Sequence, residues 1–292
     1  AMAGAVWPNG GHQTFNAIYL AQNIGVALGA ALGGFVAELS FNYIFLANLI
    51  MYVLFAIVAI TQFNLEIHVK FKHQDAIDLK SKENKKRFTA MMLICAMFAI
   101  CWIAYIQWET SIASFTQSIN ISMSQYSVLW TINGIMILVA QPLIRPIIVI
   151  LRGNLKRQML VGILVFMSSF LVTSFANHFA IFVVGMVILT FGEMFVWPAV
   201  PTIANKLAPE GKQGQYQGFV NSASTVGKAF GPFIGGVLVD TFNMSMMFIG
   251  MIVLLCFGLI FLGLFDRGLP KDYNDNQPER EPRRKRKQRH NA

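Results

Sequence analysis

Eight apolar segments run through the sequence, each long enough to cross about 30 Å of hydrocarbon as a helix. These segments lie near residues 14–38, 41–63, 88–108, 125–151, 158–177, 179–204, 215–239 and 244–265. Hydrophobic residues make up 55% of the 292 residues and charged residues only 13%, which is too apolar for an ordinary soluble domain. The sequence therefore predicts an all-α polytopic membrane protein.

The basic residues lie on alternate connections between these segments. No lysine or arginine follows the first, third, fifth or seventh segment, whereas basic residues follow the second, fourth and sixth, and nine of the 23 come after Asp266. The positive-inside rule places this basic side in the cytoplasm. Residues 267–292 are therefore expected to be a disordered cytoplasmic tail that binds membrane lipid. Topology explains the net charge of +9 without a nucleic-acid partner.

One long polar connection, residues 64–87, divides the chain. It mixes four acidic with seven basic residues and is interpreted as a cytoplasmic linker between two helical bundles. Two apolar segments precede it, in residues 1–63, and six follow it, in residues 88–266. This imbalance, and a first residue that is not methionine, predict that further helices precede Ala1.

A glycine pattern recurs at a constant offset of 202 residues. Its members are Gly25, Gly29 and Gly33 in the first segment, and Gly227, Gly231 and Gly235 in the seventh. Small residues at every fourth position let two helix backbones approach closely in lipid. A parallel repeat of about 200 residues relates the halves of some transporters. On that count the first segment is the fifth of twelve helices.

The second copy of this pattern, Gly227-x-x-x-Gly231-Pro232-x-x-Gly235-Gly236, resembles the antiporter signature of the major facilitator superfamily. The first copy is similar but has Ala30 in place of proline. Tyr19 to Asn23, and Gly192-Glu193 followed by Pro198, are similar to bacterial drug/proton antiporters of the twelve-helix type. The resemblance implies a major facilitator fold with eight of twelve helices present, in the inner membrane. It also implies export of small amphipathic, often cationic substrates in exchange for protons.

Two carboxylates are candidates for proton or substrate binding. The resemblance implies that Glu193 binds a cationic substrate or a proton, and charged groups at membrane depth are usually functional. A structural carboxylate bonded between helices is the alternative. Glu109, at the outer end of the third segment, corresponds to an acidic residue that the family links to proton translocation. It is equally explained as an exposed interfacial residue.

Two basic residues also lie within apolar segments. Arg145 is seven residues from Arg152, about 10 Å deeper in the membrane at 1.5 Å per residue. It either snorkels to the cytoplasmic surface or pairs with a carboxylate that closes a gate. Lys228 shares a helical stripe with Gln217, Asn221 and Ser224, and this stripe predicts a face toward a substrate. Lys228 either pairs with an acidic residue or takes part in coupling.

Aromatic and methionine side chains could form an adaptable pocket that attracts cations, with Trp197 as the first candidate. The glycines named above, with Pro232, are expected to pack or gate the helices. No phosphate loop, catalytic triad or metal cluster occurs in the sequence, so we expect neither an enzyme nor a cofactor. The expected oligomeric state is a monomer.

Two alternative functions remain open at this point. A metabolite or sugar symporter of the same fold would carry stereospecific hydrogen-bonding substrates inward. A membrane scaffold or sensor would carry no flux at all, and neutralising Glu193 would have no effect on it.

Overall fold

The computed structural model describes residues 21–26, 28–29, 32–34, 36, 40–62, 81–151, 153–209 and 211–269. These residues form helices and turns, and no strand occurs among them. The helices in chain order are α3 (Phe41–Gln62), α4 (Lys82–Tyr105), the 3-10 turn η1 (Ile106–Trp108), α5 (Ser111–Ser118), α6 (Met123–Val139), α7 (Gln141–Ile150), α8 (Leu155–Thr173), α9 (Phe179–Leu207), α10 (Gln213–Thr241) and α11 (Met244–Leu264). The expected all-α class is confirmed.

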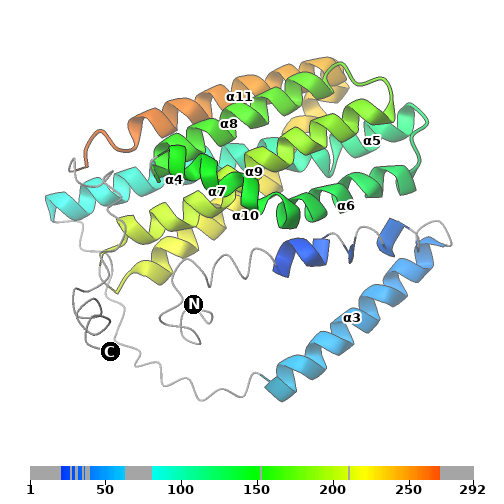
Figure 1. Ribbon diagram of the computed structural model, residues 1–292, viewed down its shortest axis with the longest axis horizontal. Coiled ribbons are helices and arrows are strands. Elements are labelled where there is room, and N and C mark those ends of the chain that lie inside the picture. Colours follow the sequence, from blue (N-terminus) through cyan, green and yellow to red (C-terminus); the bar gives the residue numbers. More distant parts are fainter. Residues whose placement is uncertain are drawn as a thin grey trace, which may run out of the picture.

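Helices α4 to α11 pack into one bundle, and α3 lies apart from it (Figure 1). Five of the described helical segments are long and apolar enough to cross a membrane, and a sixth results if α6 and α7 form one bent span. None of the most apolar stretch of α3 is buried. An apolar helix with this exposure needs lipid or further protein around it.

Short polar side chains begin several of these helices. Ser122 and Gln125 form a reciprocal capping box at the start of α6. Asn154 accepts a hydrogen bond from the Arg157 backbone at the start of α8, and Asn243 caps α11 in the same way. These caps satisfy backbone N–H groups that the first helical turn leaves unpaired.

Two expected segments differ from the helices observed. The region after residue 108, expected to be a loop, contains the additional helix α5, whose Ile112 and Thr116 are buried. The segment 125–151, expected to be one helix, bends by 58° between α6 and α7. Pro142 lies in the first turn of α7, and proline there cannot donate the hydrogen bond that would continue α6. The bend follows from this missing donor.

Glycines set the closest helix contacts in the bundle. A Cβ atom added at Gly162 of α8 would lie 2.9 Å from the Gly192 carbonyl oxygen of α9, and one added at Gly192 would lie 3.0 Å from the Gly162 oxygen. Only glycine permits the two backbones to approach this closely. Glu193 is the residue after Gly192, so it lies next to this contact.

The same kind of contact joins α10 to α4. A Cβ atom added at Gly227 would lie 2.6 Å from the Ala99 carbonyl oxygen, and Gly231 and Gly235 face Ile106 and Gln107. Gln107 donates hydrogen bonds to the carbonyl oxygens of Gly231, at 2.8 Å, and of Ile103, at 2.9 Å. The second glycine pattern is thus a packing surface along α10.

Candidate functional site

Glu193 lies inside the bundle, where only 1% of it is exposed. The Asn133 side chain of α6, also 1% exposed, donates a hydrogen bond from Nδ2 to Glu193 Oε2 at 3.0 Å. The same Nδ2 group donates to Thr190 Oγ1 at 2.9 Å, and the Thr190 hydroxyl donates to the Met186 carbonyl oxygen. A buried carboxylate is stable only when such donors face it. We call Asn133, Thr190 and Glu193 the polar triplet.

One helical turn after Glu193, Trp197 lies at the centre of an aromatic cluster. The cluster contains Phe98, Trp102 and Tyr105 of α4, Trp130 of α6, Phe166 of α8 and Trp197 of α9. Trp197 stacks on Trp102 with ring centroids 4.8 Å apart and an interplanar angle of 22°. Its centroid lies 5.3 to 5.4 Å from those of Phe98, Tyr105 and Phe166.

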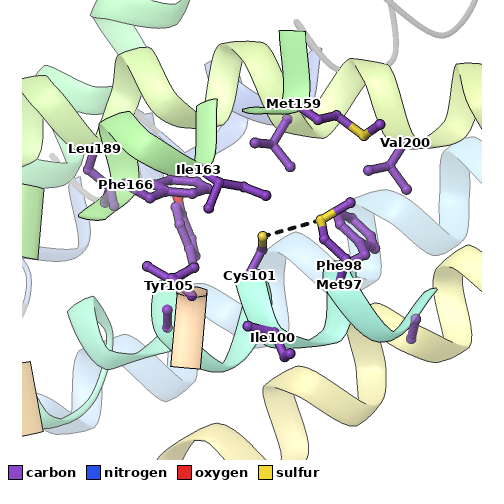
Figure 2. Packing of buried hydrophobic residues seen from close by; sticks show 14 of the residues in the cluster. Met97, Phe98, Ile100, Cys101, Tyr105, Met159, Ile163, Phe166, Leu189 and Val200 are labelled. Carbon is purple, nitrogen blue, oxygen red and sulfur yellow. Dashed lines mark hydrogen bonds between the residues drawn. The ribbon is translucent and has the colours of Figure 1, made fainter. Parts of the chain in front are cut away.

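The α4 members of the cluster point toward α8 and α9. Figure 2 shows Phe98 and Tyr105 on this side of α4, together with Cys101, while Phe166 faces them from α8. Gly162, four residues before Phe166, brings α8 against α9 and so places this ring beside Trp197. The polar triplet and the aromatic cluster are therefore adjacent parts of one region, contributed by α4, α6, α8 and α9.

Lys228 of α10 reaches the aromatic cluster from the side. Its ammonium nitrogen lies 4.0 Å from the centroid of the Trp102 ring, and the residue is exposed. Gly227, the preceding residue, packs directly on the Trp102 Cβ atom. Asn221, two helical turns earlier, is also exposed. Of the predicted stripe, Gln217 instead donates a hydrogen bond to the Pro201 carbonyl oxygen of α9 at 2.8 Å.

Glu109 lies outside the polar triplet. It follows η1 in a turn, is exposed, and interacts electrostatically with Lys228. The structure thus relates Glu109 to Lys228, and Glu193 to Asn133. The two predicted carboxylates do not form one pair.

The remaining predicted residues take several positions. Pro232 lies inside α10, between the packed Gly231 and Gly235. In the part of the chain that the structure describes, no atom comes within 4 Å of a Cβ added at Gly25, Gly29 or Gly33. Their neighbour Gly34 lies against Ser127 of α6. The Arg145 side chain, Ala30 and the tail from residue 270 lie outside the described residues.

Several residues of this region were not singled out from the sequence. Asn133 is the main omission, although an amide inside the apolar segment 125–151 is the type of group that marks a helix contact in membranes. Trp102 and Phe166 were not distinguished from the other aromatic residues, since lipid-facing and buried aromatic side chains have the same sequence pattern. Within the described residues, no group of three or more His, Cys, Asp or Glu side chains could hold a metal ion.

Comparisons with known proteins agree with this architecture. Residues 88–291 match the family model described as Major Facilitator Superfamily. The chain is 47% identical over 277 residues to the uncharacterized MFS-type transporter YttB of Bacillus subtilis, covering 95% of the chain and 70% of YttB. It is 24% identical to YqjV of the same organism, an uncharacterized MFS-type transporter, covering 78% of the chain and 56% of YqjV.

A solved structure shows the same fold. The crystal structure of peptide transporter POT superposes on 88% of this chain and 51% of its own, with a TM-score of 0.56 and 18% sequence identity. At that identity the likeness concerns the fold alone. The family match, the YttB relative and the helical bundle together show that this chain belongs to the major facilitator superfamily.

Proposed function

We propose that this protein is a secondary transporter that exports small amphipathic cations in exchange for protons by alternating access. Glu193 holds a proton and the substrate cation in turn. The observation that supports this most directly is the position of Glu193, buried within the bundle, bonded to Asn133 and one helical turn from the aromatic cluster. Membership of a transporter superfamily supplies the general class of activity.

Competition for one carboxylate couples the two fluxes. A cation near a carboxylate favours its ionised form, so arrival of the substrate promotes release of the proton. Because linkage is reciprocal, proton binding lowers the affinity for the cation by the same factor. The aromatic cluster adds an attraction of about 0.5–2 kcal/mol for a cation over a ring. Its rings also provide the apolar surface that an amphipathic substrate needs.

The same proposal gives the rest of the chain a part in the transport cycle. Residues 1–63 end an N-terminal bundle, residues 64–87 link it to the bundle of residues 88–266, and the two bundles rock about the substrate. The protein lies in the bacterial inner membrane as a monomer with a cytoplasmic C-terminal tail that contacts lipid. It needs no cofactor.

Efflux of the fluorescent cation ethidium from cells tests this proposal. We expect efflux that stops when a protonophore collapses the proton gradient, and that Glu193→Gln abolishes at equal expression. Glu83→Gln is the matched control, because Glu83 is an exposed residue that pairs only with Arg87 of its own helix among the described ion pairs. Gradient-dependent efflux that survives in Glu193→Gln would refute the role of Glu193. Absence of efflux in the wild type would favour a metabolite carrier or a scaffold.

A further inference from the structure

Lys228 holds the position over Trp102 that a cationic substrate would be expected to take. Its ammonium group lies 4.0 Å from the Trp102 ring centroid, well inside the roughly 6 Å range of cation–π attraction. Trp102 is also the ring that stacks on Trp197, one turn from Glu193. If the Lys228 charge only repelled the substrate, it would weaken the binding of a cation to the Trp102 ring.

The backbone contact beneath Lys228 shows why the ammonium group lies there. Gly227 packs against the Trp102 Cβ atom and the Ala99 carbonyl oxygen, so α10 meets α4 directly beside the indole ring. Lys228 is the next residue, and its ammonium group lies over the ring. The stem is flexible, because Lys228 is exposed.

The Lys228 ammonium group also interacts with a negatively charged residue, Glu109. The Lys228 charge acts on the Glu109 carboxylate, which follows η1 at the end of α4 and is exposed. The Glu109 carboxylate is therefore the charged group toward which the ammonium group would move when it leaves the ring.

Trp102 carries another feature of an incomplete binding site. Its Nε1 atom is buried and has no hydrogen-bond partner within the described structure. Buried polar groups are nearly always paired, so an unpaired indole N–H is a position that an acceptor group of a ligand would satisfy. The ring face fits an organic cation, and the N–H group fits a hydrogen-bond acceptor on those cations that carry one.

We propose that Lys228 is a tethered competitor for the cation subsite on Trp102, and that substrates bind there by displacing its ammonium group toward Glu109. Lys228 is then a specificity-determining residue, because only cations that interact with the ring better than its own ammonium group are accepted. This inference rests on the proposed function and adds the location and selectivity of one substrate subsite.

Equilibrium binding of tetraphenylphosphonium to the purified full-length protein in detergent tests the inference. Lys228→Met keeps most of the stem and removes the competing charge, so we expect affinity to rise about three- to thirtyfold. Lys228→Arg keeps a cation that stacks on the ring and should bind as the wild type does. Lys212→Met, at the start of the same helix and remote in sequence from the cluster, is the control for loss of one positive charge. Trp102→Leu in the Lys228→Met background should remove the gain.

The outcomes separate this inference from its alternatives. Unchanged or weaker tetraphenylphosphonium binding in Lys228→Met, with the protein still monodisperse, would overturn it. Binding of the anionic probe 8-anilinonaphthalene-1-sulfonate that depends on Lys228 would instead assign Lys228 to an anion site, and would also overturn it. Neither result would contradict gradient-dependent export through Glu193. Conversely, if Glu193→Gln did not stop export, the proposed function would fail, but the expected affinity gain in Lys228→Met would be unaffected.

Discussion

Asn133 and Glu193 are 60 residues apart in the chain, and a hydrogen bond of 3.0 Å joins them in the interior of the bundle. The bond ties α6 to α9, and α6 is also the helix that bends into α7. Movement of α6 would therefore change the hydrogen bonding of the carboxylate. This relationship links the chemistry of Glu193 to the arrangement of the helices.

Replacing Asn133 by alanine should destabilise the protein, because Glu193 and Thr190 both lose the donor Nδ2. Loss of a hydrogen bond to buried polar or charged groups costs about 1–3 kcal/mol. Thermal unfolding in detergent should show a lower apparent Tm for Asn133→Ala. Asn221→Ala, at an exposed position on α10, is the control and should change little. Equal Tm values for the two variants would contradict the role of the hydrogen bond.

Gly227→Ala should separate α10 from α4. Its added Cβ would lie 2.5 Å from the Trp102 Cβ and 2.6 Å from a backbone oxygen, so one helix must shift. Overpacking of this kind costs about 1–3 kcal/mol. The control is Gly236→Ala on the same helix, where no described atom lies within 4 Å of the new methyl group. Because alanine favours helix over glycine, the control should be neutral or slightly stabilising by Tm. A control that is as unstable as Gly227→Ala would show that the packing contact is unimportant.

The aromatic cluster predicts a difference between two substitutions of Trp197. Trp197→Phe keeps a ring beside Trp102 and Phe166, whereas Trp197→Ala removes the ring that contacts four others. We expect Trp197→Ala to lose most ethidium export at matched expression and Trp197→Phe to keep a large part of it. Similar export by both variants would argue against a cation-binding role for the ring.

The ion pair between Lys156 of α8 and Asp266, just after α11, should contribute more to stability than the pair within α4. Its atoms are 2.7 Å apart and its side chains 29% and 14% exposed, against 34% and 60% for Arg87 and Glu83. Double-mutant cycles on Tm should give a coupling of about 1 kcal/mol for Lys156–Asp266 and less than about 0.5 kcal/mol for the exposed i,i+4 pair. The reverse order would contradict this.

Much of the fold could be predicted, because membrane-spanning helices are marked by length and hydrophobicity alone. The range 179–204 became α9 (Phe179–Leu207), and 244–265 became α11 (Met244–Leu264). The additional helix α5 was missed because eight residues with a single buried face give no such signal. The bend at Pro142 was not predicted, since prolines also occur in kinked but continuous helices.

The sequence indicates individual residues of the candidate site, but not which residues lie next to them. Glu193 stands out as a carboxylate in an apolar segment, and Lys228 as a lysine beside a glycine pattern. Which side chains face these two residues depends on how α4, α6 and α10 are rotated about their own axes. A helix that is apolar on nearly all sides has no distinct polar face, so its sequence does not specify that rotation. The partners Asn133 and Trp102 therefore emerged only from the packed structure.

Proton release on substrate binding tests the central claim most directly. Purified protein in weakly buffered detergent at pH 7 would be mixed with tetraphenylphosphonium, and the pH followed with an indicator dye. The account predicts that the wild type releases protons as the cation binds and that Glu193→Gln binds without releasing them. Equal proton release by the two proteins would contradict the assignment of Glu193 as the shared site.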